Sequence, residues 1–209
     1  NLVGGQGGAI SINNKKLIKR ANFLLDKGTD RVNFLSNYTK QFISEKKTKT
    51  KKKYYSWVDT GSEYRASELS SALIYSQLMR SNQLIRKRKV IWNYYYKFLK
   101  NISINHKDIE LLSIDKKTQN VFHLFSFKLK SKKLASELRS FLQKNKVPAT
   151  FHYVPLHSSK FGKKFKHGNM DITNNIWMRI IRLPIYPDLK KNEIFKILNL
   201  LKLFFNRKK

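Results

Sequence analysis

The chain has 209 residues, 41% of them hydrophobic, which is enough for one folded domain or two small ones and excludes wholesale disorder. Its 44 Lys and Arg residues outnumber its 13 Asp and Glu residues and give a formal net charge of +31, and the absence of cysteine excludes disulfides and thiolate metal sites. No apolar run is long enough to span a membrane, so we expect no membrane partner and a cytoplasmic location.

Basic residues occur in nearly every segment rather than in one patch. Scattered lysines alongside many Asn, Ile, Phe and Tyr residues are typical of a proteome-wide compositional bias. A basic nucleic-acid-binding module stays open as an alternative, but no known reader motif accompanies the charge, so we consider nucleic acid an unfavoured partner. A positive field would also attract nucleotide diphosphates.

The first part of the chain contains one clear helical pattern. Residues 9–12 are interpreted as a short strand. The apolar spacing that follows predicts a helix over about 14–27, with Gly28 as its stop. Residues 29–44 are irregular and polar, and 43–53 form a lysine-rich loop, because its like charges repel one another.

The rest of the chain begins with a long helical pattern over about 67–99, whose apolar residues form two adjacent seams. Strand and helix patterns then alternate. The predicted strands cover 121–129, 149–154 and 180–183, and the predicted helices lie near 134–142, 172–178 and 194–205. This alternation indicates a small α/β or α+β domain with one sheet.

Single motifs give little functional information. The glycine-rich turn at 4–8 lacks the spacing of a dinucleotide fingerprint or a P-loop, which favours an ordinary tight turn. His152 and His157 are five residues apart with Pro155 between them, so they cannot share a helix face as in a zinc protease. We therefore expect no metal site.

Three stretches taken together are more specific. Residues 26–31 read DKGTDR, residues 57–69 read WVDTGSEYRASEL, and residues 151–159 read FHYVPLHSS. In order and spacing they resemble segments of the DegT-type sugar-nucleotide aminotransferases, above all the dTDP-4-amino-4,6-dideoxygalactose transaminases. The resemblance covers nearly the whole chain except the lysine-rich stretch, which looks like an insertion.

The resemblance implies a fold class: α/β, as the C-terminal part of a fold-type I transferase that depends on pyridoxal 5'-phosphate (PLP). Residues 1–80, including the lysine-rich loop 43–53, would be the remainder of the PLP-binding large domain. Residues 81–209 would be the small C-terminal domain, with the long helix as the link. Asn1 and the glycines after it resemble the segment that follows the Schiff-base lysine. That lysine is therefore expected immediately before Asn1, no catalytic residue is expected in this chain, and the chain alone is expected to be inactive.

The implied reaction moves an amino group from glutamate to C4 of a dTDP-4-keto-6-deoxyhexose, a step in cell-surface polysaccharide biosynthesis. PLP would supply the electron sink and a lysine amine would hold it. Members of the family are usually dimers with shared active sites, so we also expect a homodimer.

The resemblance also marks candidate site residues. Glu63 stands where many members have an Asn that reaches the PLP phosphate, and a carboxylate there is unfavourable, so Glu63 either points away or marks a weakened cofactor site. Tyr64 follows it, and Arg65 is a candidate ligand for the diphosphate of the substrate. The sugar pocket would be lined by His152, Tyr153 and His157.

Other interpretations remain open. A PLP-dependent sugar dehydratase would have the same fold, with His in place of the lysine before Asn1. A degenerate or split gene product without activity is a further possibility.

Overall fold

The computed structural model describes residues 2–5, 7–31, 54–115 and 117–207. The chain divides into two compact units, one over Leu2–Met79 and one over Arg80–Lys209. Each unit is described by itself. The lysine-rich loop predicted at 43–53 lies outside the described residues.

The unit Leu2–Met79 contains helices α1 (Lys15–Leu25) and α3 (Glu68–Met79). Asn14 caps the first turn of α1, because its side chain accepts a hydrogen bond from the Lys16 N–H at 3.0 Å. The helix predicted over 14–27 is thus present with shorter ends. Residues 9–12 form no strand, contrary to prediction: among the described residues they have no pairing partner, and Ile10 is exposed.

Two glycines, Gly28 and Gly61, approach each other closely just after the end of α1. Gly28 has φ +75° and donates to the carbonyl of Phe23 at 2.8 Å, which closes the last turn. A Cβ on Gly28 would collide with the carbonyl of Asp59, and a Cβ on Gly61 would collide with the backbone nitrogen of Gly28. The segment after α1 and the segment before α3 therefore pack backbone to backbone.

The unit Arg80–Lys209 begins with α4 (Ser81–Asn105), which buries Ile91, Tyr95 and Leu99 at a spacing of four. The prediction of a single helix over 67–99 is wrong, because the segment forms two separate helices, α3 and α4, that are divided at Arg80. Arg80 between them has φ −105° and ψ 7°, and the weak helix formers Ser81 and Asn82 follow it.

One antiparallel sheet occurs among the described residues, with strand order β1 (Ile109–Leu111), β2 (Phe125–Leu129), β3 (Ile180–Leu183). Alternation along β2 places Phe125, Phe127 and Leu129 in the core, and β3 contributes Ile181 and Leu183 to the same side. The opposite face carries Ser126 and Arg182, which are directly opposed in the register, together with Lys128 and Ile180.

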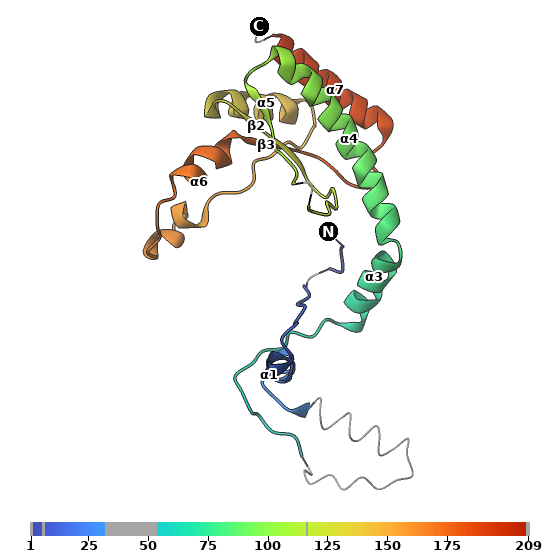
Figure 1. Ribbon diagram of the computed structural model, residues 1–209, viewed down its shortest axis with the longest axis vertical. Coiled ribbons are helices and arrows are strands. Elements are labelled where there is room, and N and C mark those ends of the chain that lie inside the picture. Colours follow the sequence, from blue (N-terminus) through green and yellow to red (C-terminus); the bar gives the residue numbers. More distant parts are fainter. Residues whose placement is uncertain (1, 6, 32–53, 116, 208–209) are drawn as a thin grey trace. The chain divides into compact units, whose positions relative to one another are not determined.

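Helices cover the apolar face of the sheet. These are α4, α5 (Lys132–Lys144) and α7 (Lys191–Asn206), and α4 and α7 run side by side (Figure 1). The short helix α6 (Asp171–Ile176) and a 3₁₀ turn at Trp177–Arg179 lead into β3, and two further 3₁₀ turns lie at Leu156–Ser158 and Gly162–Lys164. The core is contributed entirely by this unit among the described residues, from Ile91 to Phe205.

The strand predicted over 121–129 is shorter than expected, the strand predicted over 149–154 is not formed, and β1 was not predicted. Residues 121–124 leave the strand pattern because Phe122 has φ +52°, with its N–H donating to the side chain of Asn120 at 2.7 Å. Residues 149–154 make only an isolated bridge between Thr150 and Arg182, and Pro155 follows without an N–H to donate. β1 has three residues, too few to produce an alternating pattern.

No described helix combines the length and the apolar character needed to cross a bilayer.

Candidate functional site

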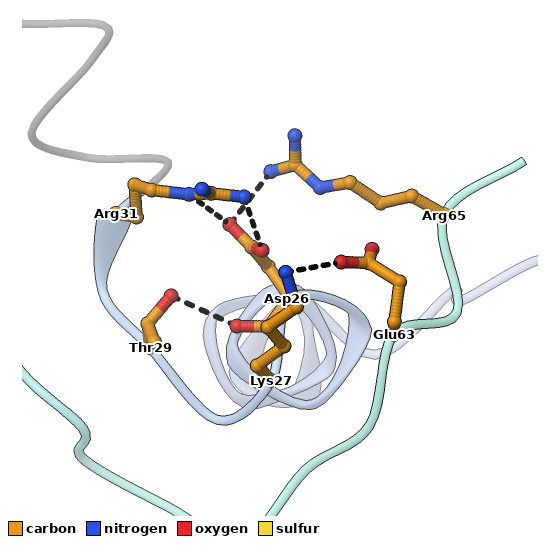
Figure 2. A network of polar contacts seen from close by, with 6 residues as sticks. All are labelled: Asp26, Lys27, Thr29, Arg31, Glu63 and Arg65. Atoms are coloured by element: carbon orange, nitrogen blue, oxygen red, sulfur yellow. Dashed lines mark hydrogen bonds and ion pairs between the residues drawn. The ribbon is translucent and has the colours of Figure 1, made fainter. Parts of the chain in front are cut away.

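The first group of polar residues surrounds Asp26 at the end of α1. Its side chain is fully buried and accepts hydrogen bonds from Arg31, at 2.8 and 3.1 Å, and from Arg65, at 3.0 Å. Figure 2 shows the carboxylate between the two guanidinium groups, which come from opposite sides. Thr29 completes the turn by donating from its hydroxyl to the carbonyl of Asp26 at 2.8 Å.

The charges of this group do not cancel. The hydrogen bond from Arg31 is the main cause that lowers the pKa of Asp26, and the charges of Arg65, Arg31 and Lys27 add to it. Two guanidinium groups share one carboxylate, so one positive charge remains in excess. Arg31 and Arg65 keep 34% and 38% of their side chains exposed, which leaves N–H donors for an outside anion.

Glu63 lies next to this group but faces Lys27, whose ammonium is 2.7 Å from the carboxylate. This hydrogen bond is the main cause that lowers the pKa of Glu63. Lys27 has φ +58°, and the strand-like bridge between Asp26 and Glu63 brings the two segments together. The Glu63 carboxylate is thus held by a cation of its own unit.

Two of the three residues predicted in this unit therefore have partners inside it. Glu63 is paired with Lys27, and Arg65 is fixed by Asp26. Tyr64 between them is anchored by its backbone N–H, which donates to Leu25 at 3.1 Å, and its ring is exposed. The cofactor and substrate roles of these residues stay predictions.

The glycine-rich turn is tied to α3 by one side chain. The amide of Gln77 accepts from the Val3 N–H at 2.8 Å and donates to the Val3 carbonyl at 2.6 Å, as a neighbouring strand would. A Cβ on Gly4 would collide with Ile74. The turn is thus held close to the helix.

The second group lies in the other unit, where the segment after Val147 reaches β3. Thr150 and Arg182 exchange backbone hydrogen bonds of 3.1 and 2.8 Å. The guanidinium of Arg182 then reaches both Nδ1 of His152 and the hydroxyl of Tyr153, each at 3.4 Å. Burial is the main cause that lowers the pKa of His152, and the charge of Arg182 lowers it further.

His157 has a different neighbourhood from the other two predicted residues. Its Nε2 lies 2.8 Å from Oδ1 of Asn174 in α6, and its ring is 5.0 Å from that of His167. Tyr153, by contrast, packs its ring 3.9 Å from that of His152. Among the described residues no cluster of His, Asp and Glu could hold a metal ion.

Sequence reasoning missed three residues of these groups. Asp26 and Arg31 lie inside a segment used for the resemblance, but nothing in the sequence shows that Arg31 and Arg65 meet on one carboxylate. Arg182 does carry a signal, because it is the single charged residue in an apolar strand that alternates inward and outward.

The fold is that of known sugar aminotransferases. It matches PseC of Helicobacter pylori, titled an aminotransferase involved in the biosynthesis of pseudoaminic acid, with a TM-score of 0.72 and 18% identity over 93% of this chain and 47% of that one. The chain matches the profile of the DegT/DnrJ/EryC1/StrS aminotransferase family over residues 1–202, and it belongs to this family.

Two curated relatives match most of this chain. One is the dTDP-3-amino-3,6-dideoxy-alpha-D-galactopyranose transaminase of Aneurinibacillus thermoaerophilus, 24% identical over 91% of this chain and 45% of the relative. The other is an uncharacterized protein of Methanocaldococcus jannaschii, MJ1066, 22% identical over 97% of this chain and 50% of the relative. The chain spans about half the length of the curated relatives it matches.

Proposed function

We propose that this chain is the C-terminal portion of a PLP-dependent aminotransferase that moves an amino group from glutamate to C4 of a dTDP-4-keto-6-deoxyhexose. The family match over residues 1–202 is the observation that carries the proposal. The position C4 rests on the resemblance of residues 57–69 and 151–159. The transaminase relative is named for an amino group at C3, so the position on the sugar is part of what must be tested.

The unit Leu2–Met79 supports the assignment to a larger cofactor domain. Neither α1 nor α3 buries a residue, and large apolar side chains such as Leu69, Tyr75 and Met79 are exposed. A helix with apolar residues on several sides is stable when other elements cover it. We infer that the rest of the large domain covers these helices in the complete protein and that a homodimer shares the site.

The cations of this unit support an anion-binding role. Arg65, the candidate ligand for the diphosphate of the nucleotide sugar, keeps part of its side chain exposed, whereas Glu63 is no free anion because Lys27 holds it. When bound, PLP would supply the electron sink for amino transfer. The residue expected to bond it precedes Asn1, so this chain would contribute binding and orientation.

The other unit would bind the sugar. Tyr153 is exposed and keeps its hydroxyl available beside Arg182, and His152 and His157 add imidazole donors and acceptors. Hydrogen bonds from such groups would hold the hexose with its keto carbon in one orientation.

The test is a transamination assay on the complete protein. Purified protein is incubated with PLP, glutamate and either dTDP-4-keto-6-deoxyglucose or the 3-keto isomer, and the products are separated and identified by mass spectrometry. The proposal expects the 4-amino sugar and 2-oxoglutarate in equal amounts. A 3-amino product would move the reaction to C3. A deoxygenated keto sugar without nitrogen would identify a dehydratase, and absence of any product would overturn the proposal.

A further inference from the structure

The polar face of the sheet carries an arginine without an acidic partner. Arg182 is the central charged residue of β3, and no described Asp or Glu lies within ion-pair distance of it. Lys128 on the same face differs, because its ammonium pairs with Glu110 on β1. The contacts of the Arg182 side chain are two long hydrogen bonds, to His152 and Tyr153.

A second unsatisfied group is a histidine of the same unit. His123, two residues before the first residue of β2, has its Nδ1 buried without a hydrogen-bond partner. Such an atom is unfavourable unless a ligand or water supplies the missing bond. Burial is the main cause that lowers the pKa of His123, and the charges of Arg88 on α4, Arg182 on β3 and His152 lower it further.

We propose that Arg182, His123 and His152 form a binding site for an anionic oxygen group, either a phosphate or a carboxylate. A planar guanidinium without a carboxylate offers paired donors to such a group. The two imidazoles add one donor or acceptor each, and Tyr153 adds a hydroxyl. With a permanent positive charge and no acidic residue paired to it, the group is electrostatically incomplete, and an anion completes it.

The proposal rests on the proposed function for the origin of the anion. In a sugar-nucleotide aminotransferase two substrates bring anionic oxygens: the diphosphate of the nucleotide sugar and the carboxylates of glutamate. Arg182 would then hold one of them next to the residues proposed to bind the hexose. Inorganic pyrophosphate and glutarate are simple probes that separate the two sources.

The experiment follows the histidine side chains by NMR. The chain contains five His residues, so specifically labelled histidine gives five imidazole signals. We expect pyrophosphate or glutarate to shift the signals of His123 and His152 and to raise their pKa, because a bound anion favours the protonated imidazole. His106, packed against Phe205 in the core region, serves as the internal control and should not respond.

Variants decide whether Arg182 is responsible. Arg182→Gln should weaken binding of the active probe at least about tenfold, since it removes charge-assisted hydrogen bonds. The matched control Lys128→Gln loses the same charge on the same face and should bind within about twofold of the original chain. Arg182→Lys keeps the positive charge and the fold but loses the paired N–H donors of the planar guanidinium. It should bind the active probe about threefold or more weakly. If Arg182→Gln fails to fold, the Arg182→Lys comparison carries the test.

The outcomes separate clearly. A response to pyrophosphate alone assigns the diphosphate, a response to glutarate alone assigns the donor carboxylate, and a response to both supports a general anion site. No shift at His123 and His152 with either probe overturns the inference, as does equal binding by Arg182→Gln. None of these readouts requires PLP or turnover. A negative transamination assay would therefore disprove the proposed function without contradicting the proposed anion-binding site.

Discussion

At the scale of single residues, one carboxylate fixes the positions of two arginines. Asp26 is buried, and its loss would leave Arg31 and Arg65 repelling each other with no anion between them. A buried carboxylate that keeps its charge costs desolvation energy, which hydrogen bonds from two guanidinium groups offset. Asp26 therefore gives the turn after α1 its shape and fixes the position of the Arg65 guanidinium.

The first prediction is that Asp26→Asn destabilises the protein by about 1–2 kcal/mol. Breaking a fully buried pair costs more, but here both guanidinium groups are partly exposed. The control is Asp188→Asn, because that carboxylate is 84% exposed and its pair with Lys87 lies on the surface. Unfolding in urea measures both variants, and equal stability of Asp26→Asn and the original protein would contradict the argument.

The same residue predicts a pH dependence. The folded pKa of Asp26 is lowered, so the unfolded chain takes up a proton at higher pH than the folded one. Its contribution to stability is therefore complete above the unfolded pKa of about 3.9 and is lost as the pH falls through the folded pKa. The unfolding free energy of the original protein should fall more steeply below about pH 4 than that of Asp26→Asn. If the unfolding free energies of the two proteins fell equally steeply, the ion pairs of Asp26 would not be the cause of the pH dependence.

A further prediction concerns the proposed sugar-binding residues. His152→Ala or Tyr153→Phe in the complete enzyme should lower kcat/KM for the nucleotide sugar by about 1–3 kcal/mol and change the glutamate half-reaction much less. The reason is that hydrogen bonds to the hexose are lost, and the glutamate half-reaction involves no hexose. Single-turnover measurements of each half-reaction, alongside a melting curve, test this. Equal losses in both halves together with a lower Tm would show that these residues only support the fold.

At the scale of elements, the sequence predicts helices and strands whose apolar residues recur with a strong period. It misses breaks and turns that depend on contacts between distant residues. The helices α1, α5 and α7 and the strand β3 follow from their apolar spacing. The break at Arg80 and the left-handed Phe122 depend on single backbone positions, which the apolar pattern does not register. The site shows the same division: residues 63–65 and 152–157 were found by resemblance, whereas the meeting of Arg182 with His152 depends on a strand-to-loop bridge.

The end of α1 gives a prediction at this scale. Gly28→Ala should destabilise the protein by about 1–3 kcal/mol, because φ +75° is unfavourable for alanine and the new Cβ collides with the Asp59 carbonyl. Gly168→Ala is the matched control, since its φ is not in the left-handed region and nothing lies within 4 Å of the added Cβ. Thermal unfolding compares the two. A tolerated Gly28→Ala would mean that the loop carrying Asp59 moves away easily.

At the scale of the whole molecule, basic residues and buried apolar residues are distributed differently along the chain. Among the described residues, the buried apolar side chains belong to the unit Arg80–Lys209, whereas basic residues occur throughout the sequence. The core could be predicted from the periodicity of α4, α5 and α7. The uncovered helices of the unit Leu2–Met79 could not, because a helical pattern shows which face is apolar and not what covers it.

The net charge of +31 leads to the last prediction, that the chain binds DNA without sequence preference and only at low salt. Scattered lysines attract phosphates by releasing counterions, so a contact with several phosphates weakens at least about 100-fold between 50 and 200 mM salt. Fluorescence anisotropy with two unrelated duplexes should give affinities within about threefold of each other. Deleting residues 46–53, which lie outside the described part, should reduce the salt dependence by removing basic residues. Strong preference for one duplex that persists at 200 mM salt would instead favour a dedicated nucleic-acid-binding function, since base-edge contacts are the part of such an interface that carries sequence information.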